Sequence, residues 1–285
     1  MKSRRYTVVD VFTATPLKGN PLAVVVDAEG LSDEQMQAFA RWTNLSETSF
    51  LLPPTQTGAD YRVRIFTPQR ELPFAGHPTL GSCQAWLNQG GAAQGDEVVQ
   101  ECAVGLVRVR RQQGRPAFAA PPLLRSGPLE ASVLTQIRAA LHLQPEDIVA
   151  HQWVDNGPGW CAVMLRSAEQ VLALQPDFAA LQPLELGVVG PHLQKVGVLA
   201  PQQGEAQFEV RAFISTLGVS EDPVTGSLNA GLAQWLIGAG LAPDHYVAAQ
   251  GTALGRAGRV HVASEGATIW VGGAVQTLVQ GTVNL

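Results

Sequence analysis

The sequence predicts an α+β protein built from two related halves, and three observations support this fold class. The chain has 285 residues, more than the ~100–200 residues usual for a single domain. Its 29 glycines and 19 prolines separate many segments of strand length, and only a few segments show a helical pattern. One sequence pattern also occurs twice, in the same order, in the two halves of the chain.

Short strands dominate the predicted secondary structure, because apolar residues alternate or run together between turn residues. In the first half, strands are predicted at 6–12, 22–26, 49–52, 61–66, 98–103 and 106–111. In the second half, they are predicted at 161–165, 195–200, 209–214, 258–263 and 268–272. We expect one lobe at 1–120 and a second at 123–273, joined by an Ala-Ala-Pro-Pro segment, with a final strand at 274–285 that can pair with either lobe.

The helical segments have recognisable starts. Ser32 followed by Asp33 and Glu34 supplies a cap and first-turn acids, and apolar residues follow at helical spacing. Proline is favoured at the first position of a helix, so Pro78 and Pro223 predict helices at 78–89 and 223–239. A further helix is expected near 130–143.

Composition excludes several classes of function. Hydrophobic residues make up 46% of the chain and charged residues 15%, which is sufficient for a large core and unlike a disordered protein. The net charge is −5, and the only basic cluster lies in a predicted hairpin, where a solvated strand face explains it better than nucleic acid does. The arginines of that cluster are Arg108, Arg110, Arg111 and Arg115.

No pattern predicts a metal, an organic cofactor or a disulfide framework. The three cysteines are odd in number and far apart, and no two of the six histidines have the i,i+4 spacing of a helical zinc site. The glycines at 251, 255 and 258 have the wrong spacing for a dinucleotide loop. Because no segment resembles a signal peptide or a membrane span, we expect a cytoplasmic protein.

The internal repeat directs attention to two helix starts. The stretch His77-Pro78-Thr79-Leu80-Gly81-Ser82 matches Asp222-Pro223-Val224-Thr225-Gly226-Ser227 in its Pro, Gly and Ser, 145 positions apart. A weaker match relates 19–24 to 156–163, in the same order. Two matches in the same order make duplication of a domain the better explanation.

Each repeat has a titratable residue directly before its proline. If the two halves face each other, His77 and Asp222 project from opposite walls of a cleft, and both helix N-termini attract an anionic substrate. Acid and base groups on two sides of a bound carboxylate are what proton removal and return require. Glu47, at the entrance to an apolar strand, is a third candidate, because burial of a carboxylate favours uptake of a proton.

Structural roles are the alternative for each of these residues. Asp222 is a suitable helix N-cap, and Ser227 can be an ordinary first-turn serine. His77 can be a turn histidine bonded to the backbone, and Glu47 an exposed strand-edge residue.

Motifs over nearly the whole chain resemble the phenazine-biosynthesis PhzF family. They are Asp10-Val11-Phe12, Gly19-Asn20-Pro21-Leu22-Ala23-Val24, Ser46-Glu47-Thr48, Arg64-Ile65-Phe66-Thr67-Pro68, Phe74-Ala75-Gly76-His77-Pro78-Thr79, Glu221-Asp222-Pro223-Val224-Thr225-Gly226-Ser227 and Gln250-Gly251. The resemblance implies a diaminopimelate-epimerase-like fold: two pseudo-repeated lobes, each a curved mixed β-sheet wrapped around a central helix. It also implies a homodimer that uses neither metal nor organic cofactor.

The resemblance further implies proton transfer within a small amino or hydroxy acid similar to dihydro-hydroxyanthranilate. Glu47 would be the general acid/base, with His77 and Asp222 as catalytic partners. The substrate, a small carboxylate, would be bound by Asn20, Gly76, Gly226 and Ser227.

Two other functions remain open at this point. The first is racemisation or epimerisation of an amino acid with His77 and Asp222 as the two bases; the related epimerases have cysteines at the matching positions, and neither residue here is cysteine. The second is a non-catalytic member of the family that binds a small molecule or a protein. The residues alone do not identify the substrate.

Overall fold

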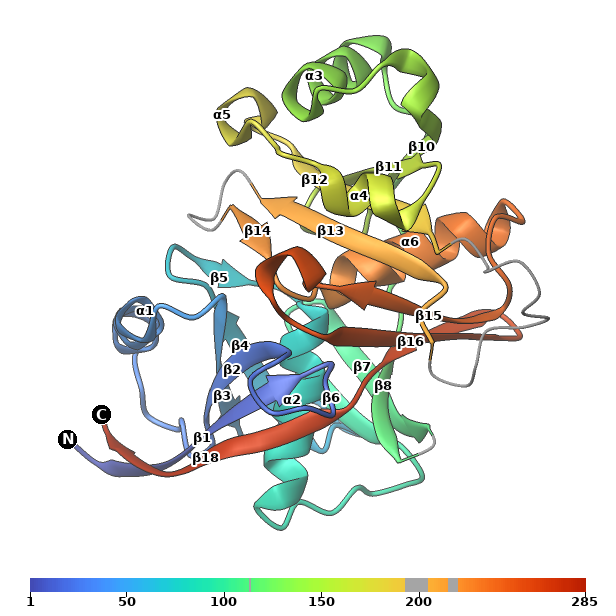
Figure 1. Cartoon of the computed structure of the whole chain (residues 1–285). Coiled ribbons are helices and arrows are strands. Elements are labelled where there is room, and N and C mark those ends of the chain that lie inside the picture. The colour runs from blue at the N-terminus through green and yellow to red at the C-terminus, as the bar shows by residue number, and fades with distance from the viewer. Residues whose placement is uncertain (113, 193–204, 215–219) are drawn as a thin grey trace. The chain divides into compact units, whose positions relative to one another are not determined.

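The computed structural model describes residues 1–112, 114–192, 205–214 and 220–285, and it divides into two compact units (Figure 1). Unit 1 comprises Met1–Ala119 with Gly272–Leu285, and unit 2 comprises Ala120–Val271. The first boundary therefore lies inside the predicted connecting segment. Within the described residues, no helix has both the length and the apolar character needed to cross a membrane.

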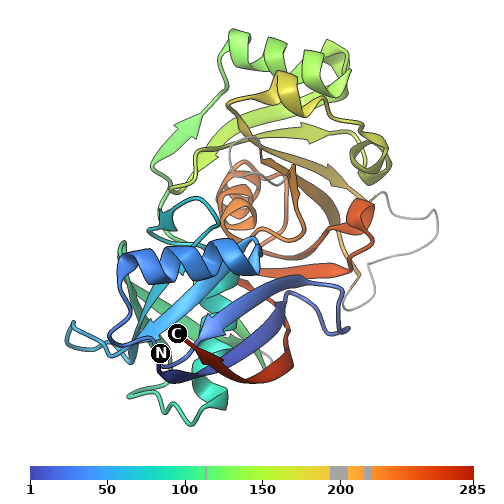
Figure 2. The same ribbon diagram turned by 90° about the vertical axis from the view of Figure 1, so that its left-hand side faces the viewer.

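Unit 1 contains most of the first-half elements together with the last strand of the chain. Its helices are α1 (Asp33–Thr43) and α2 (Gly76–Asn88). Its strands are β1 (Ser3–Val11), β2 (Asn20–Val25), β3 (Glu47–Leu52), β4 (Tyr61–Phe66), β5 (Glu71–Leu72), β6 (Val98–Cys102), β7 (Gly105–Gln112), β8 (Arg115–Ala119) and β18 (Val275–Asn284). The final strand β18 pairs with β1, so the two chain ends lie side by side (Figures 1 and 2).

Unit 2 repeats this order of elements. Its α-helices are α3 (Ala131–Leu141), α4 (Ala168–Ala173), α5 (Phe178–Leu181) and α6 (Gly226–Gly238), with short 3₁₀ helices at Pro145–Asp147 and Thr252–Leu254. Its strands are β9 (Arg125–Gly127), β10 (Ile148–Asp155), β11 (Trp160–Leu165), β12 (Glu185–Pro191), β13 (Phe208–Ile214), β14 (Glu221–Asp222), β15 (His245–Gln250), β16 (Gly258–Glu265) and β17 (Thr268–Gly272), the last ending at the unit boundary.

The two units share one pattern of strand pairing. In unit 1, β1 and β2 are antiparallel, β2 and β3 parallel, β3 and β4 antiparallel, β4 and β6 parallel, and β6 and β7 antiparallel. In unit 2, the strands β10, β11, β12, β13, β15 and β16 pair in the same alternation. The short strands β5 and β14 pair with the ends of β4 and β13. Each unit is therefore a mixed sheet of the same topology, which confirms the predicted α+β class.

An ion pair recurs at equivalent positions of the two sheets. In unit 1, Arg64 of β4 makes a bidentate bond to Glu71 of β5, with its guanidinium 5.1 Å from the ring centroid of Phe66. In unit 2, Arg211 of β13 makes the same bond to Glu221 of β14, and its guanidinium lies 4.8 Å from the Phe213 ring. The shared Arg-x-Phe…Glu arrangement relates the two units residue by residue.

Each unit has one central helix, α2 in unit 1 and α6 in unit 2. Figure 1 shows α2 enclosed by the strands of its own sheet. Glycine permits this close approach: a Cβ on Gly81 would lie 2.6 Å from the Leu22 side chain, and one on Gly231 would lie 2.3 Å from the Val154 carbonyl oxygen. Real Cβ atoms do not approach other atoms so closely, so the helix positions depend on these two glycines.

Other helices cover the opposite face of each sheet. In unit 1, α1 lies against the strands of its own sheet (Figure 2). It begins with the capping box of Ser32 and Gln35, and its buried Met36 and Phe39 pack with Phe50 of β3. In unit 2, α3, α4 and α5 pack on apolar residues of β11, β12 and β13. Side chains alternate along a strand, so one set of residues on each sheet faces the central helix and the other set faces these covering helices.

The starts of both central helices differ from the prediction. Helix α2 begins at Gly76 rather than Pro78, and α6 begins at Gly226 rather than Pro223. The structural repeat therefore has an offset of 150 residues at the helices, not the 145 of the sequence match. Proline has no N–H to satisfy in a first turn, so it fits the third helical position of α2 as well as the first.

The sequence also missed several elements of unit 2. Strands β10, β12 and β15 were not predicted, and the strand expected at 195–200 lies outside the described residues. In β12, a glutamate, two glycines and a terminal proline obscure the strand pattern.

The close approach of α6 to its sheet gives the first testable prediction. Replacement of Gly231 by Ala forces a methyl group against the Val154 carbonyl, and we expect it to reduce the free energy of unfolding by about 1–3 kcal/mol. Gly238→Ala, in the same helix with open space around its Cβ position, serves as the control and is expected to raise stability by up to about 1 kcal/mol. Urea denaturation of both variants measures the difference, and equal stabilities would contradict the packing argument.

Candidate active site

In unit 1, the structure brings Glu47, His77 and Asn20 together. Glu47 is the first residue of β3, and its Oε2 lies 3.3 Å from Nδ1 of His77 in the first turn of α2. The side-chain amide nitrogen of Asn20, at the start of β2, lies 3.5 Å from the same Nδ1. The side chains of Glu47 and His77 are 14% and 3% exposed, so the exposed strand-edge role for Glu47 is wrong.

Local backbone geometry explains how Glu47 reaches this position. Helix α1 ends at Thr43, and Asn44 reverses the chain in the left-handed conformation with φ 54°. Asparagine tolerates this conformation better than most residues, and β3 begins three residues later.

His77 is a neutral imidazole under ordinary conditions. Burial lowers the pKa of His77 to about 3, although a hydrogen bond to the Pro21 backbone acts in the opposite direction. A neutral imidazole nitrogen can donate to a carboxylate or, in the other tautomer, accept from a carboxylic acid. The contact with Glu47 is therefore compatible with both protonation states of the carboxyl group.

Asp10, a buried residue of β1, fixes the loop before Asn20. Its Oδ2 accepts hydrogen bonds from the backbone N–H groups of Lys18 and Gly19 at 3.0 and 3.2 Å. A Cβ on Gly19 would lie 2.2 Å from the Val11 carbonyl oxygen, so only glycine permits this close approach. Asp10 thus positions the segment that presents Asn20 to His77.

In unit 2, Asp222 belongs to a buried hydrogen-bond network and does not cap α6. Thr225, the residue in the N-cap position, donates its hydroxyl to Asp222 Oδ2 at 2.5 Å. The side chain of Gln250 donates to the Asp222 carbonyl and to the Thr225 hydroxyl, and it accepts from the Thr225 backbone N–H. Because Asp222 lies in β14, four residues before the helix, the N-cap role considered for it is wrong.

Ser227 lies in the first turn of α6 and has two polar neighbours in the same unit. The indole N–H of Trp160 donates to its hydroxyl at 3.0 Å, and the amide of Asn156 donates to its carbonyl at 2.9 Å. These bonds connect the start of β11 to the start of α6, and Gly226 directly precedes Ser227 as the first helical residue.

Neither central helix has a side-chain cap at its N-terminus. Ala75 and Thr225 occupy the N-cap positions, and neither side chain accepts a hydrogen bond from the first turn. First-turn N–H groups that lack a cap favour an anion, such as a carboxylate. Gly76 and Gly226, both expected at the substrate, are the first residues of the two helices.

The three cysteines are not suited to act as nucleophiles or proton carriers. All three are free and buried, and burial raises the pKa of Cys83 and of Cys161 to about 12. In the described part of the chain, no group of three His, Cys, Asp or Glu side chains is arranged to hold a metal ion.

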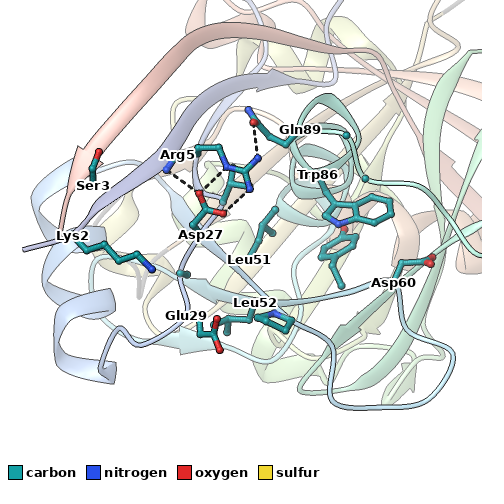
Figure 3. Close-up of a pocket in the computed structure, with 16 residues that line it drawn as sticks. Lys2, Ser3, Arg5, Asp27, Glu29, Leu51, Leu52, Asp60, Trp86 and Gln89 are labelled. Atoms are coloured by element: carbon teal, nitrogen blue, oxygen red, sulfur yellow. Dashed lines mark hydrogen bonds and ion pairs between the residues drawn. The ribbon is translucent and has the colours of Figure 1, made fainter.

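A separate cavity of about 550 Å³ lies elsewhere in unit 1 (Figure 3). Its wall includes the bidentate pair of Arg5 and Asp27 and the indole of Trp86, which stacks on Tyr61 with 5.3 Å between ring centroids. None of Asn20, Glu47 and His77 lines it. This cavity is therefore separate from the candidate active site.

Sequence reasoning did not assign the contacts of the polar residues that hold the site residues in place, which are Asp10, Asn156, Trp160, Thr225 and Gln250. Their contacts join residues between 3 and 71 positions apart and follow no regular spacing, so no periodic pattern reveals them. Asp10, Thr225 and Gln250 do lie within the motifs that suggested the family.

The architecture and the site together define a class of protein. Each unit is a mixed sheet around a central helix with an uncapped first turn, and polar side chains gather at that turn. This is the α+β, epimerase-like class that the sequence predicted.

Comparison with known proteins identifies the family. The model of the phenazine biosynthesis-like (PhzC-PhzF) family matches residues 9–282. The trans-2,3-dihydro-3-hydroxyanthranilate isomerase of Pseudomonas aeruginosa is 36% identical over 267 residues, 92% of this chain and 91% of that protein. A Schizosaccharomyces pombe protein named antisense-enhancing sequence 1 is 33% identical over 297 residues and covers 99% of each chain. The crystal structure of a PhzF family protein from Enterococcus faecalis matches all of both chains with a TM-score of 0.79 and 27% identity.

The chain therefore belongs to the phenazine biosynthesis-like family, and it is an isomerase. The family and the fold class predicted from its motifs are confirmed.

The buried imidazole predicts a pH dependence of stability. His77 has a pKa of about 3 in the folded protein and about 6.5 when unfolded, so the unfolded chain binds the extra proton below pH 6.5. The contribution of neutral His77 to the free energy of unfolding is complete above pH 6.5. As the pH decreases toward 3, this contribution falls by up to about 1.4 kcal/mol per pH unit. In urea denaturation between pH 7 and pH 5, His77→Gln is expected to lose less stability than the wild type; parallel losses would show that His77 is not the titrating group.

Proposed function

We propose that this protein is a cofactor-independent isomerase that moves a proton within a small amino or hydroxy acid similar to dihydro-hydroxyanthranilate. Glu47 is the general acid/base of the proposed reaction. The contact of 3.3 Å between Glu47 and the neutral imidazole of His77 is the observation that carries this proposal.

A group that removes a proton and later returns one has to be stable in both forms. Ionised Glu47 can accept a hydrogen bond from His77 Nδ1–H, and protonated Glu47 can donate to Nδ1 of the other tautomer. A permanent cation at His77 would favour only the ionised form, but burial keeps this imidazole neutral. The pair thus provides a carboxyl group that can be cycled between acid and base.

Substrate binding is the role proposed for the polar residues around the helix starts. In unit 1, Asn20 offers a donor to a polar group of a small acid, and in unit 2, Asp222 and Ser227 offer acceptors and a donor. In each unit, the uncapped first turn of the central helix, which begins at Gly76 in α2 and at Gly226 in α6, suits a carboxylate. The name of the Pseudomonas aeruginosa relative supports a cyclic amino and hydroxy acid as the substrate.

Replacement of Glu47 by Gln tests the mechanism. The amide keeps the shape of the side chain but cannot exchange the proton, so we expect the rate to fall by about 10²- to 10⁴-fold. The measurement is NMR in D₂O, with dihydro-hydroxyanthranilate and a panel of amino and hydroxy acids, following product formation and deuterium uptake.

Two controls make this result specific. Glu34→Gln, at an exposed position in the first turn of α1, is expected to keep wild-type activity. Deuterium that enters only the α-carbon of an amino acid would instead indicate racemisation, with His77 and Asp222 as the bases. Activity of Glu47→Gln close to that of the wild type would rule out the proposed mechanism.

A further inference from the structure

The indole of Trp160 determines which hydrogen bonds the hydroxyl of Ser227 can make. Trp160 is the first residue of β11, and its Nε1 lies 3.0 Å from Ser227 Oγ. An indole N–H can only donate, so the oxygen of Ser227 has to accept this bond. Both residues are buried, with 3% of Trp160 and 6% of Ser227 exposed, and an indole N–H left unpaired there would be unfavourable. The direction of the bond is therefore fixed by the chemistry of the indole.

The hydroxyl hydrogen of Ser227 remains available to a bound molecule. A serine hydroxyl has one hydrogen to donate and two lone pairs that accept, and the indole occupies one of the lone pairs. Within the part of the chain that the structure describes, no group accepts a hydrogen bond from the Ser227 hydroxyl. The hydroxyl hydrogen rotates away from the indole N–H, so Ser227 is set to donate to a ligand.

The loop before β11 holds the indole in this position. Asp155 Oδ1 accepts hydrogen bonds from the backbone N–H groups of Gly157 and Gly159, both at 2.7 Å. The two glycines have φ of 137° and 99°, and these values close the turn directly before the tryptophan. The amide of Asn156 in the same loop donates to the Ser227 carbonyl at 2.9 Å. The loop therefore fixes the backbone of Ser227, while the indole fixes its hydroxyl.

The repeated architecture shows that packing at this point does not need an N–H donor. Trp160 pairs in parallel register with the first residue of β12, and in unit 1 Leu22 pairs in the same way with the first residue of β3. Leu22 is completely buried, so an apolar side chain fills the equivalent place in unit 1. The indole N–H is thus an addition of unit 2, where the second residue of the central helix is Ser227 instead of His77.

The partner that suits a donating Ser227 is a group that only accepts hydrogen bonds. A carboxylate has two anionic oxygens and no hydrogen, and hydrogen bonds to a charged acceptor are stronger than those to a neutral one. An ammonium group can only donate, so it cannot pair with a hydroxyl whose hydrogen is the available group. The first turn of α6, to which Ser227 belongs, has no side-chain cap and likewise favours negative charge.

We infer that Trp160 is a positioning residue of this isomerase, whose indole N–H makes the Ser227 hydroxyl a donor to the carboxylate of the substrate. The inference rests on the proposed function and extends it, because it assigns the carboxylate of the substrate to Ser227. Trp160 acts through Ser227 and does not itself bind the substrate.

NMR of the tryptophan side chains tests the hydrogen bond itself. In a ¹H–¹⁵N spectrum with the six indole N–H signals assigned, Ser227→Ala is expected to move the Trp160 signal upfield and to speed its exchange with water. The signal of Trp153, whose indole donates to Glu130, is expected to stay in place. A Trp160 signal that is the same in wild type and Ser227→Ala would overturn the inference.

Binding of two matched probes tests the role in recognition. Trans-2-aminocyclohexanecarboxylate and its carboxamide differ only at the carboxyl group. By isothermal titration calorimetry at pH 7, the wild type is expected to bind the carboxylate more tightly. Ser227→Ala is expected to weaken carboxylate binding by about 10- to 100-fold and Trp160→Phe by about 3- to 20-fold, with effects below about threefold on the carboxamide.

A double variant separates positioning from packing. Because Trp160 acts through Ser227, the variant that carries both Trp160→Phe and Ser227→Ala is expected to bind the carboxylate as Ser227→Ala does. Trp153→Phe makes the same substitution in the adjacent strand β10 and should leave both affinities unchanged. If Trp160→Phe proves unstable, the response of the wild-type Trp160 indole signal to the carboxylate decides, and no response would overturn the inference.

The possible results also distinguish the inference from the proposed function. Additive losses in the double variant, or a wild type that does not prefer the carboxylate, would overturn the role of Trp160. If Glu47→Gln then still abolishes deuterium exchange, the isomerase mechanism stands without this role. Coupled loss of carboxylate binding, in a protein that catalyses no exchange, would support the positioning role and contradict the isomerase mechanism.

Discussion

The close packing of a helix inside each curved sheet is the constraint on which the rest of the structure depends. Gly81 and Gly231 let α2 and α6 approach their strands more closely than any residue with a Cβ permits. With the helices held there, their first turns lie beside the first residues of β2, β3 and β11. The contact of His77 with Glu47 and the contact of Ser227 with Trp160 both follow from this packing.

Duplication preserved the scaffold while the chemistry of the two units diverged. Both units keep the strand pairing and the Arg–Glu ion pair, which hold the ends of β5 and β14 in place. At the equivalent positions within these short strands, unit 1 has Leu72 and unit 2 has Asp222. Likewise, the second helical residue is His77 in α2 and Ser227 in α6. Unit 1 thus provides a carboxyl–imidazole pair, whereas unit 2 provides carboxylates and a hydroxyl.

The sequence predicted the fold class better than it predicted the bounds of the central helices and the hydrogen bonds around the candidate site residues. Apolar alternation and turn residues located β4 and β17 with their observed bounds, because such signals are local. The starts of α2 and α6 were misplaced, since proline is acceptable at several first-turn positions. The network of Asp222, Thr225 and Gln250 joins residues up to 28 positions apart, and no periodicity encodes it. Strand β12 was not predicted, because a glutamate, two glycines and a terminal proline obscure its strand pattern.

Burial of acidic side chains has a cost that packing alone does not explain. Moving a carboxylate out of water is unfavourable unless partners compensate for the lost hydration, so a buried acid is retained where it has a task. Asp10 meets this condition through two backbone N–H bonds that set the loop before Asn20. Glu221 meets it through its bidentate bond with Arg211. Asp222 meets it in part through the Thr225 hydroxyl, which donates to its Oδ2 within the buried network of Gln250.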